Sequence, residues 1–241
     1  MLETSAAKNA GELKENAYPG RGIVLGATPD DKKLVQIYWI MGRSENSRNR
    51  IFLKESEFVR TKAYDESKVK DPSLIIYFPV KVDGTRHIVS NGDQTDTVYS
   101  FLKAGKSMEE ALHTREFEPD APNFTPRITG FMDLGSPVAY TLSILKAHNG
   151  NPAYPVRYFY NYEKAIPGIG HLIHTYASDG DPLPSFSGEP KIMPVYSDIK
   201  ENLDFYWSLL NVENRVSLMV KTIDRQTGKT DIEMINKHEV K

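Results

Sequence analysis

The chain has 241 residues, of which 39% are hydrophobic and 26% charged, a balance that can bury a core and that excludes global disorder. With a net charge of −2, the chain lacks the basic excess that non-specific nucleic-acid binding requires. This balance does not exclude a local basic pocket for one phosphate. The absence of cysteine excludes disulfides, thiolate catalysis and zinc–thiolate sites.

Residues 1–17 are polar and lack the apolar core of a secretory signal, so we expect a short helix or a frayed extension there. The rest, 18–241, is predicted to form a single domain. No apolar run approaches 18 residues, so no membrane-spanning helix is expected. The predicted location is the cytoplasm.

The first elements along the chain are predicted strands. Turn residues at 18–22 precede a short apolar strand over 23–26, and residues 33–41 form the next strand, so the two make a hairpin. The charged residues 54–72 predict a connection with room for one helical turn.

Residues 74–82 are rich in β-branched and aromatic types and predict a further strand. The Asp83-Gly84 pair is a hairpin-turn signal, so residues 87–89 should return as its partner. Apolar residues at helical spacing after position 93 predict a helix, and Ser107 with Glu110 forms a capping-box pattern that opens another.

The second half of the chain predicts a run of strands after an acidic, Pro-rich loop over 115–127. These strands cover 128–134, 138–146, 156–163 and 171–177. A long loop over 179–194 is followed by an amphipathic helix and a closing hairpin that joins 216–223 to 232–235. About nine strands in hairpin succession, with three or four helices, predict an α+β fold of two stacked antiparallel sheets covered by helices.

The segment 43–50 is the first candidate for a binding site. It places three arginines, two amides and two hydroxyls in eight residues between two apolar runs. The planar guanidinium suits phosphate because it donates two parallel hydrogen bonds and keeps its charge. The alternative is a solvated loop with surface charges.

Two further polar segments are candidates. Residues 90–96 lie at a predicted strand-to-helix junction, where free N–H groups favour an anion, although an ordinary helix start capped by Asp93 is the alternative. An acidic stretch with Glu118 and Asp120 precedes Asn-Phe-Thr-Pro-Arg at 123–127. A carboxylate there could act as a base or position arginines, or the stretch could be a surface loop with ion pairs.

Tyr77 and two histidines complete the candidates. A buried tyrosine usually only hydrogen-bonds its hydroxyl, but beside arginines it could donate to a carbonyl oxygen. His171 and His174 are three residues apart on a predicted strand and should face opposite ways, so no metal site is predicted.

Four segments in order carry a resemblance to a known family. They are Tyr-Pro-Gly-Arg-Gly-Ile-Val-Leu-Gly (18–26), the arginine-rich segment (43–50), Val-Ser-Asn-Gly-Asp-Gln-Thr-Asp-Thr (89–97) and Asn-Phe-Thr-Pro-Arg-Ile (123–128). The chain resembles the archaeal-type inosine monophosphate (IMP) cyclohydrolase family in its bacterial branch, most closely over 18–130. The resemblance implies a four-layer αββα fold like that of the N-terminal nucleophile hydrolases.

The resemblance also implies an enzyme that cyclises 5-formamidoimidazole-4-carboxamide ribonucleotide (FAICAR) to IMP with loss of water, in the last step of de novo purine synthesis. It implies no metal or organic cofactor and no nucleic-acid or membrane partner, but a purine mononucleotide ligand and a homo-oligomer such as a tetramer. The implied catalytic residues are Tyr77, as donor to the formyl oxygen, and Glu118, with Asp120 as an open alternative to Glu118. The implied substrate-binding residues are Arg21, Arg43, Asn49, Arg50, Asn91, Gly92, Thr95, Asp96, Asn123, Thr125 and Arg127.

Two other functions stay open from the residues alone. One is an amide hydrolase of the same fold, although Leu2 leaves no Ser or Thr at the N-terminus after simple removal of Met1. The other is a non-catalytic protein that binds purine nucleotides through the arginines.

Overall fold

Five α-helices and thirteen strands fall within residues 1–69 and 76–238, which are the residues that this computed structural model describes. The helices are α1 (Leu2–Glu15), α2 (Glu45–Arg48), α3 (Gln94–Lys103), α4 (Met108–His113) and α5 (Ile199–Leu209). One sheet consists of β1 (Gly22–Ala27), β2 (Lys33–Met41), β10 (Ile169–His174), β11 (Lys191–Pro194), β12 (Arg215–Asp224) and β13 (Thr230–Asn236). The other consists of β3 (Ile51–Glu55), β4 (Phe58–Lys62), β5 (Val80–Asp83), β6 (Arg86–Ser90), β7 (Arg127–Asp133), β8 (Tyr140–His148) and β9 (Asn151–Tyr162).

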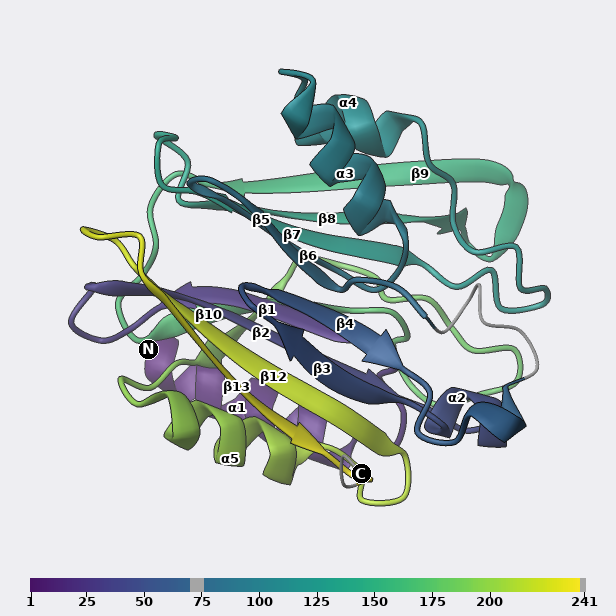
Figure 1. Ribbon diagram of the computed structural model, residues 1–241. Helices are drawn as coiled ribbons and strands as arrows, with labels where there is room; N and C mark the ends of the chain where they lie inside the picture. Colours follow the sequence, from purple (N-terminus) through teal and green to yellow (C-terminus); the bar gives the residue numbers. More distant parts are fainter. Residues whose placement is uncertain (70–75, 239–241) are drawn as a thin grey trace.

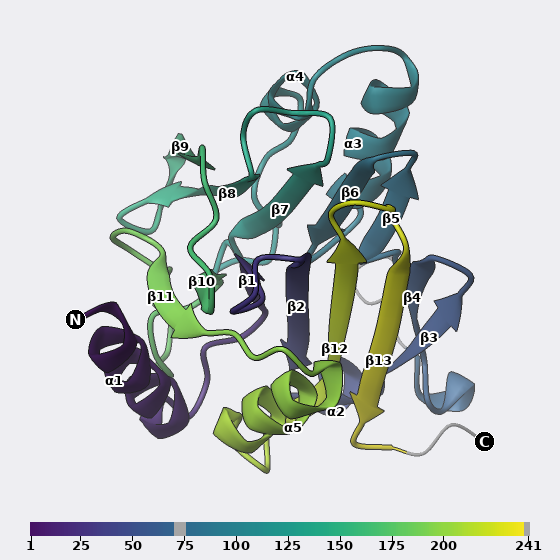
Figure 2. The same ribbon diagram turned by 90° about the vertical axis from the view of Figure 1, so that its left-hand side faces the viewer.

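The elements stack in four layers (Figure 1). Helices α3 and α4 cover the seven-stranded sheet, in the order β3-β4-β5-β6-β7-β8-β9, and α1 and α5 cover the six-stranded sheet. Figure 2 shows the six-stranded sheet from the side, in the order β11-β10-β1-β2-β12-β13. All the strand pairs within the two sheets are antiparallel in the described part of the chain. The predicted α+β class with two stacked antiparallel sheets is confirmed, and its helix-covered αββα order is the one the resemblance implied.

Strand β2 shows why the sheets stack. Successive side chains of a strand point to opposite faces, so an apolar run supplies two cores at once. Leu34, Tyr38 and Ile40 belong to the core between the sheets. Val35 and Trp39 belong to the core beneath α1 and α5. A third core forms where Ile88 of β6 packs against α3 and α4. Three apolar interfaces therefore hold four layers together.

The close packing at the start of β1 requires a glycine. A Cβ atom at Gly22 would lie 2.0 Å from the Trp39 ring, which stands opposite it in the sheet. The Trp39 indole N–H donates to the Gly20 carbonyl at 3.1 Å, and Gly20 has a φ of +72°. The backbone on both sides of Arg21 is therefore set by contacts with β2.

Several predicted elements are confirmed. The strand over 33–41 matches β2, and the hairpins β1–β2, β5–β6 and β12–β13 form as expected. Ser107 and Glu110 make both hydrogen bonds of the capping box at the start of α4. Residues 1–17 are predominantly the helix α1, with Ala6, Ala10 and Leu13 buried. The division into an extension and a single domain over 18–241 stays a prediction.

The predicted connection over 54–72 is wrong in its first part. Residues 51–62 form the hairpin β3–β4, and a 3₁₀ turn follows at Glu66–Lys68. In β4 the buried residues Val59 and Thr61 alternate with partly exposed ones. Because the residues on the outer face of β4 are polar or charged, the sequence resembled a connection, although the inner face of this strand is packed in the core. The long loop predicted over 179–194 likewise ends in a strand, β11.

The strand predicted over 74–82 begins only at Val80. Residues 74 and 75 lie outside the described residues, and 76–79 are not in a strand. Pro79 has no N–H with which to join a ladder. Tyr77 is therefore in the segment that enters β5, and not in the middle of a strand as predicted.

Candidate active site

Five chain segments meet at one end of the two sheets. Three of them enter strands β1, β5 and β7, and two leave strands β2 and β10. Antiparallel pairing places Gly22, at the start of β1, opposite Trp39 and His174, which lie near the ends of their strands. Polar side chains from both sheets therefore converge at this end, and they include residues predicted from the sequence.

Arg21 and Glu118 form an ion pair at the centre of this end. Arg21 Nη2 donates to Glu118 Oε1 at 2.8 Å, and their side chains are only 12% and 8% exposed. Burial by itself would lower the pKa of Arg21, but the charge of Glu118 holds that pKa well above its ordinary value. Burial raises the pKa of the Glu118 carboxyl against the opposing charges of Arg21 and Arg127. The pair gives the site a fixed cation and a carboxyl that can take up a proton.

A pair of tyrosines lies beside the ion pair. The hydroxyls of Tyr38 and Tyr77 are 2.7 Å apart, and both side chains are buried. Burial holds the pKa of Tyr38 well above its ordinary value, so Tyr38 stays a neutral phenol. Tyr38 and Tyr77 both lie within electrostatic range of the Arg21 guanidinium.

Thr125 and Tyr176 also lie at this end, where the Tyr176 hydroxyl is within electrostatic range of the Arg21 guanidinium. Thr125 Oγ1 lies 2.5 Å from the Tyr176 hydroxyl, and burial raises the pKa of Tyr176 to about 12. The Asp120 carboxylate accepts from the Thr125 N–H at 2.6 Å and also bonds the Thr125 hydroxyl. Asp120 is thus engaged within its own loop, whereas Glu118 of the same loop reaches Arg21.

Arg43 and Arg50 flank the site in different ways. Arg43 is 39% exposed and donates to Asp179 Oδ1 at 2.6 Å, and its guanidinium lies 5.1 Å from the Tyr18 ring. Arg50 is almost fully buried and donates to the Ser47 carbonyl at 2.8 Å. Arg43 therefore lies at the rim of the site, whereas Arg50 holds the backbone that carries α2.

Arg127 and Asn91 hold the acidic loop to the sheet. Arg127 donates to the Glu116 carbonyl at 2.7 Å and to Asp93 Oδ1 at 2.8 Å, and burial lowers its pKa. The Asn91 amide donates to the Pro126 carbonyl at 2.8 Å and accepts from the Ile128 N–H at 2.9 Å. These bonds fix the direction in which the loop with Glu118 enters β7.

The comparison with protein families agrees with this geometry. A family model described as IMP cyclohydrolase-like protein matches residues 18–228, which include every residue of the site. The chain belongs to this family. No curated protein matches the chain.

The family match leaves α1 outside its range. In the described part of this IMP cyclohydrolase-like protein, no helix is long and apolar enough to cross a membrane. Within the same residues, no group of three His, Asp or Glu side chains could hold a metal ion. His171 and His174 instead bond the Tyr140 hydroxyl and the Tyr176 carbonyl, both at 2.7 Å.

Some predicted binding residues of the IMP cyclohydrolase-like chain face other partners. The Asn49 side chain makes two hydrogen bonds to the backbone of Asp65. Asp96 is half exposed and pairs with Lys81 at 2.6 Å. Asn123 accepts from the Leu183 N–H at 3.0 Å. These three are not brought to the Arg21–Glu118 pair.

Thr95 and Gly92 belong to the helix start that was the alternative for residues 90–96. The Thr95 hydroxyl lies 2.5 Å from that of Ser90 and is fully buried. A Cβ atom at Gly92 would meet the side chains of Gln94 and Arg127. Asp93 occupies the N-cap position of α3, as that alternative predicted, but its side chain makes no capping hydrogen bond and pairs with Arg115 and Arg127 instead.

The site also contains residues that the sequence did not single out, namely Tyr38, Tyr176 and Tyr18. Tyr18 stacks on Tyr176 with ring centres 5.8 Å apart. Because side chains alternate between the two faces of a strand, the sequence could have placed Tyr38 on the same face of β2 as Leu34 and Ile40. It could not have paired Tyr38 with Tyr77, because that contact joins two different sheets.

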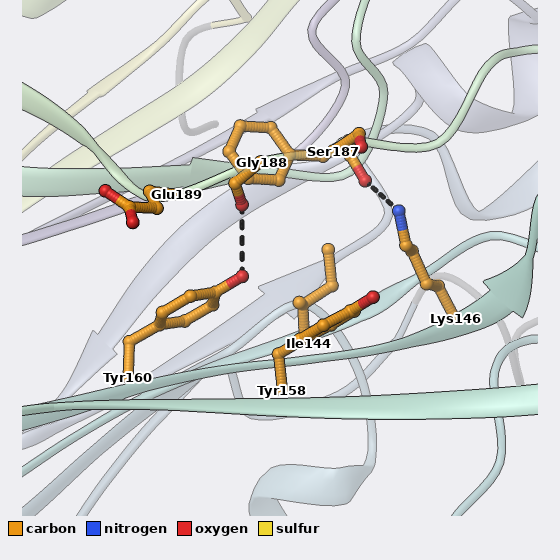
Figure 3. Close-up of a pocket in the computed structure, with 8 residues that line it drawn as sticks. Ile144, Lys146, Tyr158, Tyr160, Ser187, Gly188 and Glu189 are labelled. Atoms are coloured by element: carbon orange, nitrogen blue, oxygen red, sulfur yellow. Dashed lines mark hydrogen bonds between the residues drawn. The ribbon is translucent and has the colours of Figure 1, made fainter.

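Two grooves lie at the edge of the sandwich beside β8 and β9. The groove in Figure 3, of about 320 Å³, is lined by Ile144, Lys146, Tyr158, Tyr160 and residues 186–189. It contains none of the predicted binding residues. The adjoining groove, of about 350 Å³, shares Lys146 with the first groove. Asn123 is the one predicted binding residue that lines it. The candidate active site is therefore the polar cluster around Arg21, and not either of these grooves.

Proposed function

We propose that this chain is an IMP cyclohydrolase that closes FAICAR to IMP with loss of water. The proposal rests on one observation: a hydrogen-bonded pair of phenols and a buried carboxyl flank the same guanidinium. Tyr77 is held by Tyr38, and Glu118 is held by Arg21. A hydrogen-bond donor and a proton acceptor are the two groups that this ring closure needs.

The reaction forms one bond and removes one oxygen. The carboxamide nitrogen attacks the formyl carbon of the same molecule, and a C–N bond forms while the formyl oxygen gains negative charge. One proton leaves the attacking nitrogen and one leaves the formamide nitrogen. Both end on the formyl oxygen, which departs as water and leaves the C=N bond of the purine ring.

Each partner group has a role in these steps. The Tyr77 hydroxyl would donate to the formyl oxygen as its charge develops, which is where a fixed donor lowers the barrier most. Glu118 would take the proton from the attacking nitrogen and return it to the leaving hydroxyl. A carboxyl with a raised pKa suits this double role, because its conjugate base is stronger and its acid form is available.

The cationic groups would bind and orient the nucleotide. Within the described residues, Arg21 Nε is buried and has no hydrogen-bond partner, so it has an N–H free for a ligand. Arg43, at the rim, has the exposure and the charge for the phosphate. Because the reaction is intramolecular, holding the carboxamide and formyl groups in contact is itself a large part of catalysis.

The deciding experiment is to incubate the purified protein with FAICAR and to separate IMP from the substrate by chromatography with mass detection. We expect IMP to form faster than in buffer alone, with a product 18 mass units lighter than FAICAR. Release of formate and the free amine in place of IMP would instead identify an amide hydrolase. Purine-nucleotide binding without either product would identify a non-catalytic binder. Location in the cytoplasm and assembly into a homo-oligomer stay predictions.

A further inference from the structure

Tyr38 lies deeper in the molecule than the residue it contacts. Its side chain is fully buried between the sheets, and its ring stacks on Phe52 with centres 5.7 Å apart. Among the described residues, the Tyr77 hydroxyl, at 2.7 Å, is the one hydrogen-bond partner of the Tyr38 hydroxyl. Tyr77 is 5% exposed and lies in the segment that enters β5.

The difference in burial favours one direction of this hydrogen bond. Two hydroxyls carry two protons, and only one can lie between the oxygens. If Tyr77 donated, the Tyr38 proton would be buried without an acceptor, which is more costly than an unused lone pair. Either hydroxyl can donate at this distance. With Tyr38 as donor and Tyr77 as acceptor, the remaining proton belongs to Tyr77, the less deeply buried of the two. The Tyr77 proton is then directed away from Tyr38 and is available to another acceptor.

Two guanidiniums lie beside the tyrosine pair. The guanidiniums of Arg21 and Arg50 both act on Tyr38, and Arg21 also lies within range of Tyr77. Positive charge stabilises negative charge that develops on a phenol oxygen. A hydrogen bond received from Tyr38 adds to this effect, because a hydroxyl that accepts one hydrogen bond becomes a stronger donor in another.

We propose that Tyr38 is a positioning residue that acts through Tyr77, holding the Tyr77 hydroxyl as a donor aimed at the substrate oxygen. This inference rests on the proposed cyclohydrolase function. Tyr38 itself touches no substrate: the chain of groups runs from Tyr38 to Tyr77 to the reacting oxygen. It assigns a role to a strand residue that lies within the core between the sheets.

The test replaces only the hydroxyl. In Tyr38→Phe the ring and its stacking remain, while Tyr77 loses its donor. We expect kcat for FAICAR cyclisation to fall about 10- to 100-fold, the effect of one hydrogen bond on a charged group. KM should change less than about threefold, because the interaction is strengthened only in the transition state. An unchanged kcat would overturn the proposal.

Tyr206→Phe is the matched control. Tyr206, on α5, is also fully buried, and its hydroxyl makes one hydrogen bond, to the Pro194 carbonyl at 2.8 Å, on the helix-covered side of the six-stranded sheet. Both variants lose one buried hydroxyl, so a general loss of stability should affect both alike. Equal kcat values in the two variants would overturn the proposal.

A second readout does not depend on turnover. Protein labelled with ¹³C at the Cζ atom of tyrosine gives one signal per ring, and the Tyr77 signal is the one that disappears in Tyr77→Phe. We expect this signal to move in Tyr38→Phe and to stay in place in Tyr206→Phe. If the wild-type protein makes no IMP, the proposed function fails, and the Tyr77 signal still decides the inference: an unmoved signal overturns it.

Discussion

The Arg21 guanidinium lies 2.8 Å from the Glu118 carboxylate, although 97 residues separate them in the chain. Arg21 precedes β1 of the six-stranded sheet, and Glu118 belongs to the loop before β7 of the seven-stranded sheet. The ion pair therefore joins the two sheets at the end where the tyrosine pair also joins them. Changes at this end should affect catalysis, whereas changes elsewhere in the sandwich should affect stability.

Glu118→Gln tests the carboxyl that the structure pairs with Arg21. The amide keeps the size of the side chain but cannot accept the proton from the attacking nitrogen. We expect kcat for IMP formation to fall about 10²- to 10⁴-fold, the usual contribution of a general acid–base group. Steady-state kinetics with FAICAR measures it.

Asp120→Asn is the matched control, because Asp120 bonds Thr125 of its own loop. We expect kcat to stay within about threefold of wild type, and the free energy of unfolding to fall by about 1–3 kcal/mol as a charge-assisted hydrogen bond weakens. If Asp120→Asn abolished turnover and Glu118→Gln did not, the catalytic assignment would pass to Asp120.

Tyr77→Phe removes the proposed donor to the formyl oxygen. Loss of one donor to a developing oxyanion lowers kcat about 10²- to 10³-fold, with a much smaller change in KM. The FAICAR assay checks this, and binding of IMP measured by calorimetry controls for an intact site. Wild-type turnover in this variant would remove Tyr77 from the mechanism.

Gly22→Ala tests the packing that sets the backbone beside Arg21. The added methyl group would lie 2.0 Å from the Trp39 ring, so Trp39 or β1 must move. We expect the free energy of unfolding to fall by at least about 2 kcal/mol, as in other overpacked cores. Urea denaturation measures the change.

Gly11→Ala is the control for that substitution. Gly11 lies in α1, and no atom would come within 4 Å of its added methyl group. Alanine is the better helix former, so we expect a gain of about 0.5–1 kcal/mol. Similar effects of the two substitutions would contradict the packing explanation.

The buried histidines predict a loss of stability in mild acid. Burial lowers the pKa of His171 to about 4, from 6.5 in the unfolded chain. A lowered pKa means that the stabilisation is complete above pH 6.5 and is lost as the pH falls toward 4. At pH 5 this amounts to about 2 kcal/mol for His171, because the unfolded chain then binds more protons.

His171→Gln should remove that part of the pH dependence. Urea denaturation at pH 7 and pH 5 gives the difference in unfolding free energy for each protein, and this difference should shrink by about 2 kcal/mol in the variant. His113→Gln, at an exposed position on α4, should leave it unchanged. An equal pH dependence in wild type and His171→Gln would show that His171 is not buried in its neutral form.

Much of the fold was predictable because its signals are local. Apolar runs, turn residues and the Ser107–Glu110 capping box depend on neighbours a few residues away. The prediction failed at β4, where a strand with a charged outer face resembles a connection. It also failed at Tyr77, whose apolar surroundings suggested a strand interior, although β5 begins only at Val80.

The candidate site divides in the same way. The sequence by itself determined the order of the four motifs, and with it the family and a set of polar candidate residues. Only the tertiary structure decided which of these residues meet: Glu118 with Arg21, Asp120 with Thr125, and Tyr77 with a partner, Tyr38, that no motif contained. The physical reason is that the Glu118–Arg21 and Tyr77–Tyr38 contacts bridge the two halves of the sandwich, whose stacking is set by the whole core and not by the spacing of residues along the chain. The bond of Asp120 to Thr125 within its loop then leaves Glu118 as the carboxyl that reaches Arg21.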